Sequence, residues 1–259
     1  MFRQLRETLA FRELLRNLTL AELKLRYRDS VLGFLWTVLN PLFFLLILAF
    51  VFSRLIRFEI PRYPLFLFAG LTSWLMIQQT VVIATASIVN NQTLIRKVAV
   101  PKLVFPLSNV LARYVDHGAL LVILLAFIPI YGAAMGWSLF FLPVAVAMHI
   151  VFSLGLSLLC AVAYIKVRDV QNIVAVVFQA LFYATPILYP VEVLPEKFRA
   201  VLMWNPFYYF VEMVRAPVYG GTLPKAGDIA IAAGLAVGVC VAGMWVFARK
   251  EKYFVFHLS

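Results

Sequence analysis

Six stretches of about twenty or more residues carry almost no charge, and they constrain the fold more than any other feature of this sequence. The clearest of them, residues 31–53, contains no Asp, Glu, Lys or Arg. A helix rises about 1.5 Å per residue, so about 20 apolar residues cross a hydrocarbon core about 30 Å thick. The sequence therefore predicts an all-α integral membrane protein.

The composition favours the same class of protein. Of the 259 residues, 64% are hydrophobic and only 14% are charged, and the mean hydropathy is +0.93. Soluble globular chains are about 25% charged. At this length we expect a single membrane domain with little room for a soluble one.

The uncharged stretches predict six transmembrane helices. The run 118–165 is too long for one helix, and we divide it at the Gly132 to Gly136 turn. The segment 190–227 contains two apolar, aromatic pieces that are each too short to span, so we expect an outer re-entrant segment between spans 5 and 6. The predicted spans are approximately residues 31–54, 65–89, 106–131, 138–165, 170–189 and 228–248, within a transmembrane domain of residues 31–259.

Residues 1–30 form a separate amphipathic region that we expect to lie on the cytoplasmic membrane surface as short interfacial helices. Charged residues such as Arg3 and Arg6 interrupt any continuous apolar core, which excludes a cleavable signal peptide. Thr19 and Glu22 have the spacing of a capping box, which predicts that a new helix begins at Leu20.

The distribution of basic residues predicts the orientation. The net charge is +11, and 16 of the 23 Lys and Arg residues lie in segments that face the cytoplasm if both termini are cytoplasmic. This positive-inside pattern explains the basic balance, so no nucleic-acid partner is expected. Cys160 and Cys240 fall inside predicted spans, where they act as small packing residues.

Templates for enzyme chemistry find no match in the sequence. The three histidines are widely separated, and no metal-binding, nucleophile or phosphate-loop motif occurs. We therefore expect no catalytic residue, no metal and no bound cofactor. A transporter without an ATP site or a proton relay must obtain its energy from a partner or act as a passive pore.

Three motifs resemble those of ABC-2 type permeases that export polysaccharides, a group that includes the O-antigen, capsule and teichoic-acid exporters. The first is KLRYRDSVLGFLW at residues 24–36, followed by Asn40-Pro41-Leu42. The second is TPILYP at residues 185–190, followed by Leu194-Pro195. The third is Asn205-Pro206, followed by Glu212, Arg215 and Gly220-Gly221. The order and spacing match the family over essentially the whole chain.

This resemblance implies a homodimer in the bacterial inner membrane with two copies of a separate ABC ATPase subunit, which holds the ATP and Mg²⁺. The expected substrate is a lipid-linked polysaccharide, O-antigen first, moved from the cytoplasmic to the outer face. Capsule, teichoic acid or a smaller lipid or drug are alternative substrates. A membrane-embedded enzyme acting on polyprenyl-linked sugars is a further alternative, but it needs clustered carboxylates that the outward segments lack.

The resemblance also implies where the ATPase binds. The cytoplasmic loop at residues 91–106 corresponds to the coupling helix of the family, and the N-terminal helices of relatives also meet the ATPase. Ordinary positive-inside anchoring is the alternative for these residues, and the arginines near the N-terminus can also attract anionic lipid headgroups. The candidate coupling residues are Arg96, Lys97, Val98, Pro101, Lys102, Arg26 and Arg28.

Aromatic residues on the first and fifth spans are candidates for the glycan pathway, because these spans line the pore in relatives and sugars stack on aromatic rings. Packing in the core or against lipid is the alternative. The candidates are Trp36, Phe43, Phe44, Phe182, Tyr183 and Tyr189.

Arg113, Asp116 and His117 share one face of the third span, because their spacing is i, i+3 and i+4. They form either a structural pair near the interface, with Arg113 reaching towards water, or a site for gating or for a headgroup. On the last span, a ridge of small residues predicts close packing against another helix: Ala230, Gly234, Gly238 and Ala242.

Overall fold

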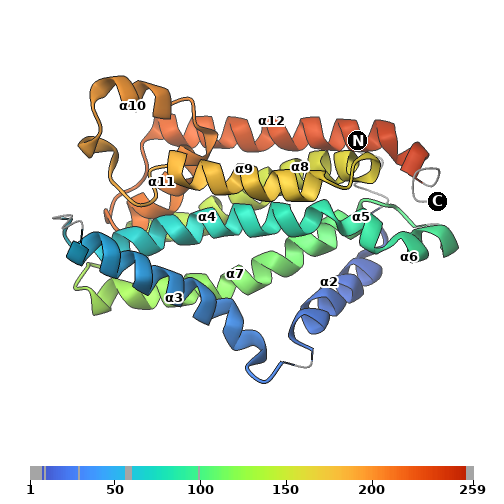
Figure 1. Ribbon diagram of the computed structural model, residues 1–259, viewed down its shortest axis with the longest axis horizontal. Coiled ribbons are helices and arrows are strands. Elements are labelled where there is room, and N and C mark those ends of the chain that lie inside the picture. Colours follow the sequence, from blue (N-terminus) through green and yellow to red (C-terminus); the bar gives the residue numbers. More distant parts are fainter. Residues whose placement is uncertain (1–7, 9, 29, 56–59, 99, 255–259) are drawn as a thin grey trace.

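A computed structural model describes residues 8, 10–28, 30–55, 60–98 and 100–254. Every regular element within these ranges is a helix, which confirms the predicted all-α class for this part of the chain. Figure 1 shows the long helices packed side by side along one common direction.

Five helical segments are long and apolar enough to cross a membrane, and they confirm five of the predicted spans. The segments, each with its main helix, are Gly33–Ser53 with α3 (Trp36–Phe50), Tyr63–Thr85 (α4), Val104–Ile130 (α7), Trp137–Lys166 with α8 (Leu142–Lys166), and Ala226–Tyr253 with α12 (Ala226–Lys250).

The sixth predicted span is shorter than expected. Helix α9 (Val170–Ala184) has 15 residues, so it is about 22 Å long and falls short of a hydrocarbon core of about 30 Å. It ends because Thr185 precedes Pro186, and the proline ring disfavours helical backbone at the residue before it. Thr185 accordingly has an extended conformation, with φ −100° and ψ 137°. A full-length sixth helix is therefore not confirmed.

The two ends of the bundle hold different sets of short elements. Figure 1 shows α2 (Arg12–Tyr27), α5 (Ser87–Asn90), α6 (Gln92–Lys97) and the carboxyl end of α12 at one end, which we call the α6 end. Helices α10 (Glu196–Leu202) and α11 (Pro206–Val218) lie at the opposite end, which we call the α11 end. Segments predicted to share a side of the membrane thus lie together, and which end faces the cytoplasm stays a prediction.

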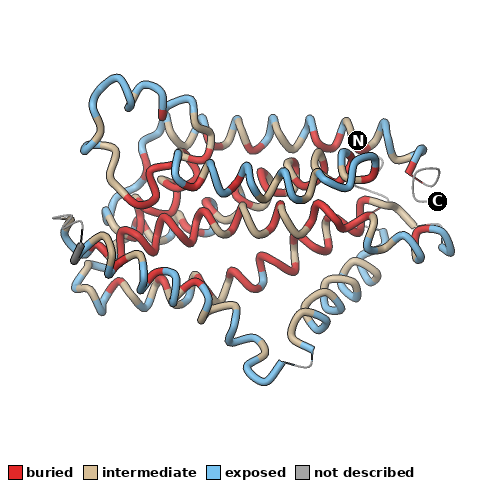
Figure 2. Tube along the Cα trace, in the orientation of Figure 1, coloured by how far each residue is buried: buried red, intermediate tan, exposed pale blue. Residues whose placement is uncertain are grey.

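Helix α4 is the centre of the bundle. It contacts α3, α7, α8, α9 and α11, and Figure 2 shows it buried along most of its length. Such a helix must be apolar around its whole circumference, as its sequence is. At its middle, Trp74 packs edge-on against the rings of Phe178 and Phe182, with centroids 5.7 and 5.9 Å away. Phe207 of α11 joins this aromatic cluster, with its centroid 5.3 Å from Trp74.

Helices α8 and α12 approach each other at glycines, although not at the predicted ridge. A methyl group added at Gly155 would lie 2.5 Å from the Cys240 backbone nitrogen, and one added at Gly243 would overlap the Gly155 carbonyl. The predicted ridge on α12 lies instead on an exposed face, and a methyl group added at Gly234 or Gly238 would meet no atom within 4 Å among the described residues. Within the described part of the chain no helix packs on this ridge, so the predicted close approach of another helix there stays a prediction.

The capping-box prediction at Thr19 was also wrong. Helix α2 runs without a break through this position. The Thr19 hydroxyl donates to the Leu15 carbonyl at 2.7 Å, one turn back along the same helix, rather than accepting from an amide ahead of it. Part of the N-terminal prediction concerns residues 1–7, which lie outside the described residues.

The segment between α9 and α12 forms two unequal pieces. Helix α10 is mostly exposed, whereas α11 is buried against α4, α8 and α12. Helix α11 begins where the sequence signals a start, because the Asn205 side chain accepts from the Phe207 amide at 3.0 Å and Pro206 occupies the first turn. With 13 residues, α11 is too short to span.

Candidate functional site

A cluster of ionised side chains joins α2 to the middle of α7 (Val104–Ile130). Asp116 of α7 is fully buried and forms ion pairs with Arg26 of α2 and with Arg113 one turn away, the latter at 3.3 Å. The Tyr27 hydroxyl donates to Asp116 at 2.7 Å and lies 2.5 Å from the Thr37 hydroxyl of α3. This Asp116 cluster therefore fixes three helices to one another.

The predicted grouping of Arg113, Asp116 and His117 on one face of α7 is confirmed as a geometric fact, since all three are buried. Arg113 does not reach towards water, however. Its guanidinium contacts Asp116 and donates a hydrogen bond to Gln79 of α4. The alternative of a gating or headgroup role stays a prediction.

Replacement of Tyr27 by phenylalanine tests the Asp116 cluster. We expect a loss of about 1.5 kcal/mol in the free energy of unfolding, because a hydrogen bond to a charged acceptor is removed. Thermal unfolding of the purified protein in detergent measures this loss. Tyr131→Phe, at the far end of α7, is the matched control, and equal losses from both changes would contradict the assignment.

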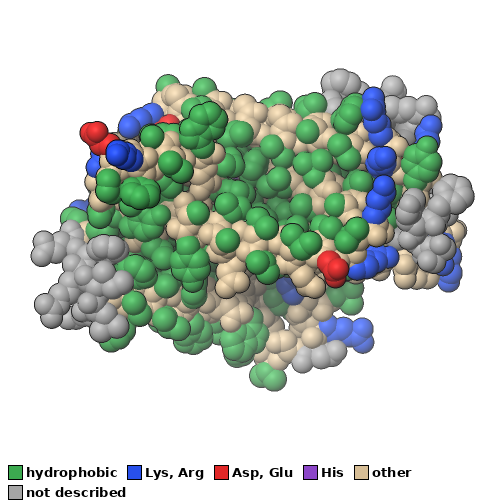
Figure 3. Space-filling view, turned by 45° about the horizontal axis from the view of Figure 1, so that its top comes forward, with side chains coloured by type: hydrophobic (Ala, Val, Ile, Leu, Met, Phe, Trp, Pro, Cys, Tyr) green, Lys and Arg blue, Asp and Glu red, His purple; other side chains and the backbone are tan. Residues whose placement is uncertain are grey.

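The predicted coupling loop contains a helix of its own. Helix α6 exposes Arg96 and Lys97 in its last turn, and Val98 follows with 46% of its surface exposed. These three residues form a basic and apolar projection at the α6 end. Figure 3 shows Lys and Arg gathered in a band near one end of a largely hydrophobic surface.

Three of the four other coupling candidates are less available to a partner than the residues of α6. Lys102 donates to the Glu251 carbonyl at 2.8 Å, which fixes the loop to the carboxyl end of α12, and Pro101 beside it is half-buried. Arg26 is paired with Asp116, and burial lowers the pKa of its guanidinium. Arg28 is exposed. The structure thus separates Arg26 from the exposed basic residues of α6.

The structure brings together only some of the aromatic pathway candidates. The rings of Phe44 and Phe182 lie 6.0 Å apart, and Phe182 meets Tyr183 at 5.3 Å. The Tyr189 hydroxyl donates to the Tyr183 carbonyl at 3.3 Å. Phe182 belongs to the buried cluster around Trp74, whereas Tyr183 is exposed.

The remaining two aromatic candidates lie apart from this group. Phe43 is exposed on α3, and Trp36 lines a polar cavity beside Arg26.

A second ionised pair, Arg215 and Glu212, lies at the α11 end. In the sequence, these two residues were named only as part of the third motif. Arg215 of α11 is buried and donates to the carbonyls of Pro186 and Ile187 at 2.7 and 3.0 Å. It also pairs with Glu212 at 3.3 Å and stacks on the Phe66 ring, 4.0 Å from its centroid. The i, i+3 spacing of Glu212 and Arg215 on an amphipathic helix could have predicted this pair.

The residues around Arg215 show why two of the sequence motifs belong together. The Asn205 amide donates to the Thr185 hydroxyl at 2.9 Å, so the start of α11 is tied to the end of α9. Arg215 satisfies the carbonyls left unpaired where Pro186 interrupts the helix. The second and third motifs thus form one corner of the structure.

Comparison with known proteins decides the family. The family model described as ABC-2 type transporter matches residues 13–219, which run from α2 to the end of α11. The chain belongs to the ABC-2 type transporter family. As an ABC-2 family member with several apolar helices of spanning length, it is a multi-pass membrane protein.

Relatives of this ABC-2 chain extend over nearly its whole length. It is 33% identical to the O-antigen export system permease protein RfbA of Myxococcus xanthus over 256 residues, 98% of each chain. It is 32% identical to RfbA of Klebsiella pneumoniae over 82% of each chain. The polysialic acid transport protein KpsM of Escherichia coli is 23% identical over 91% of this chain and 92% of its own length.

Proposed function

We propose that the chain is the transmembrane permease subunit of an ATP-driven exporter that moves a lipid-linked polysaccharide of the O-antigen class out of the bacterial cytoplasm. The observation that carries this proposal is the match to an O-antigen export permease over 98% of both chains. The permease performs no covalent chemistry in this proposal, and ATP and Mg²⁺ belong to a partner ATPase.

The proposed topology has six crossings with both termini in the cytoplasm. Helix α9 begins at the α6 end and points towards the α11 end in Figure 1. We propose that α9 and the turn residues 185–189 after it complete the sixth crossing together. Helices α10 and α11 then form the outer re-entrant segment, with Arg215 holding α11 against the break after α9.

A homodimer would provide the translocation path. Helix α3 is largely exposed, because only 11% of the residues in the most apolar stretch of Gly33–Ser53 are buried. Helix α9 buries only Phe178 and Phe182. Both helices therefore present apolar and aromatic surface outside the single chain. In the proposed dimer, the aromatic side chains of α3 and α9 line a path on which sugar rings stack and slide.

The proposed coupling runs through α6. ATP-driven closure of two ATPase subunits would push on the projection formed by Arg96, Lys97 and Val98. Helix α6 lies next to α7 in sequence, and Lys102 ties the connecting loop to the end of α12. A push on α6 is thereby transmitted to two transmembrane helices.

Charge reversal at α6 tests the coupling. We expect Arg96→Glu/Lys97→Glu to weaken ATPase binding by at least about tenfold, because opposed charges at an interface become like charges. Co-purification of the ATPase with the full-length permease and surface glycan in a strain lacking the native gene are the two measurements. Both should fall together.

Lys197→Glu/Lys225→Glu is the matched control, because it makes the same charge change on exposed residues at the α11 end. It should leave ATPase binding intact. If the α6 variant retains both ATPase and surface glycan, the coupling assignment is wrong. Concentrative glycan transport by the chain alone in vesicles, without an ATPase, would overturn the proposed function itself.

A further inference from the structure

We propose that a polar cavity between α2, α3, α4 and α7 binds the phosphodiester of an anionic glycerophospholipid, whose acyl chain lies in an adjoining apolar groove beside α2. This inference requires only that the chain lies in a bilayer. Its test therefore depends neither on the transported substrate nor on ATPase coupling.

The cavity has a volume of about 230 Å³. Its polar lining comes from four separate helices or their connections, and no carboxylate lines it among the described residues. Arg113 is more than nine-tenths buried, and its Nε has no hydrogen-bond partner within the part of the chain that the structure describes. The lining side chains that can donate to a phosphate include Arg26, Arg113, Ser30, Thr37, Asn40 and Gln79.

The side chains that line the cavity are cationic or neutral. Arg26 and Arg113 both line it, and both pair with the carboxylate of Asp116, which does not. Glu22, one turn away on α2, also acts electrostatically on Arg26, but it accepts from the Asn109 amide at 3.1 Å and does not line the cavity. Two guanidinium groups and several neutral donors in the lining favour an anion in the cavity.

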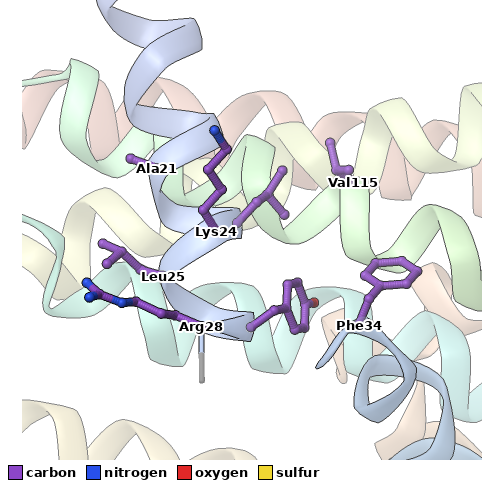
Figure 4. A pocket seen from close by; sticks show the side chains of 8 residues that line it. Ala21, Lys24, Leu25, Arg28, Phe34 and Val115 are labelled. Atoms are coloured by element: carbon purple, nitrogen blue, oxygen red, sulfur yellow. The ribbon is translucent and has the colours of Figure 1, made fainter. Parts of the chain in front are cut away.

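The groove beside the cavity supplies a place for an apolar chain. It has a volume of about 760 Å³ and is lined mainly by Ala21, Leu23, Leu25, Phe34 and Val115, with Lys24 and Arg28 at its edge. Figure 4 shows Leu25 and Arg28 on one side of it and Phe34 and Val115 on the other.

Tyr27 connects the two sites, because it lines the groove as well as the cavity. Its hydroxyl is held by Asp116 at 2.7 Å, and its ring meets Phe34 edge-on at 5.5 Å. A ligand that fills both sites must carry an anionic head directly attached to an apolar chain. A free phosphate ion would leave the groove empty, and a neutral lipid would offer no anion to the two guanidinium groups of the cavity.

The guanidinium groups of Arg26 and Arg113 in the cavity, with Lys24 and Arg28 in the groove, favour an anionic headgroup over a neutral one. Basic pockets between transmembrane helices are also typical sites for anionic headgroups. We therefore assign the site to a bulk anionic lipid such as phosphatidylglycerol. Bound there, the lipid would contact the guanidinium groups of Arg26 and Arg113 and hold α2 against the bundle.

Lipid competition in nanodiscs tests the assignment. The full-length protein is placed in phosphatidylcholine nanodiscs that contain phosphatidylglycerol as the minor component, and the lipids retained on release are counted by native mass spectrometry. We expect phosphatidylglycerol to be enriched about fivefold over its bulk fraction. Arg113→Gln should abolish the enrichment, because it removes the unpaired donor and one of the two guanidinium groups of the lining, while Asp116 keeps Arg26 and Tyr27.

A second variant and a control keep the test decisive if Arg113→Gln folds poorly. Asn40→Leu replaces a polar donor of the lining by an apolar side chain without removing a hydrogen bond recorded among the described residues, and it should also abolish enrichment. Lys166→Gln makes the same charge change at the α6 end but outside the site, and it should retain enrichment. Equal enrichment in Asn40→Leu and Lys166→Gln would overturn the proposal.

Two competitors separate the possible sources of the phosphate. Inorganic phosphate at millimolar concentration should not displace phosphatidylglycerol, because it gains nothing from the groove. Undecaprenyl diphosphate at an equal mole fraction should bind more weakly than phosphatidylglycerol. If it displaces phosphatidylglycerol instead, the site belongs to a diphosphate lipid and the assignment to a glycerophospholipid is wrong.

Discussion

Replacement of Arg215 by methionine is expected to lower the free energy of unfolding by about 3–5 kcal/mol, because it leaves buried acceptors without their donor. The Pro186 and Ile187 carbonyls and the Glu212 carboxylate all accept from this guanidinium. In the buried corner where α9 ends, water has little access to replace it. Thermal unfolding of the purified protein in detergent measures the loss.

Arg199 provides the matched control for Arg215. It also donates to two backbone carbonyls, those of Glu192 and Leu194, but it lies on the mostly exposed helix α10. Arg199→Met should therefore cost about 1 kcal/mol or less, since water replaces the arginine. Gly70→Ala should reproduce much of the Arg215 effect, because the added methyl group would overlap the Arg215 guanidinium. Similar losses from Arg215→Met and Arg199→Met would contradict the assigned role.

Replacement of Gly155 by alanine is expected to destabilise the chain by about 2–3 kcal/mol, although alanine is the better helix former by about 1 kcal/mol. The added methyl group would lie 2.5 Å from the Cys240 nitrogen and 2.6 Å from its Cα, both backbone atoms that side-chain rotation does not move. Helices α8 and α12 would have to separate. The midpoint of thermal unfolding should fall clearly.

Gly238→Ala gives the opposite expectation on the same pair of helices. A methyl group at Gly238 of α12 meets no atom within 4 Å in the described structure, so the change should be neutral or stabilise by up to about 1 kcal/mol through helix propensity. The sign of the difference between the two variants is the result to observe. If Gly155→Ala and Gly238→Ala shift the midpoint alike, the glycine contact does not set the spacing of these helices.

Local properties explain what could be predicted at the candidate sites. Asp116, Arg113 and His117 share a face of α7 because helix periodicity alone requires it, and the prediction was confirmed. Helix α6 likewise lies where a polar, basic loop was expected. In contrast, the sequence did not predict that Arg26 pairs with Asp116, a carboxylate 90 positions away in the chain. A sequence pattern does not encode such a pairing, since it depends on how α2 docks on α7.

The sequence by itself determined the helical class, the positions of five spans and the family motifs, because hydropathy and helix periodicity act over a few neighbouring residues. Tertiary structure decided the length of α9, the rotation of α12 that exposes its small-residue ridge, and the corner around Arg215. The physical reason is that a helix's rotation and its buried polar contacts follow from the shapes and donors of its neighbours. Those neighbours become known only when the helices are packed together.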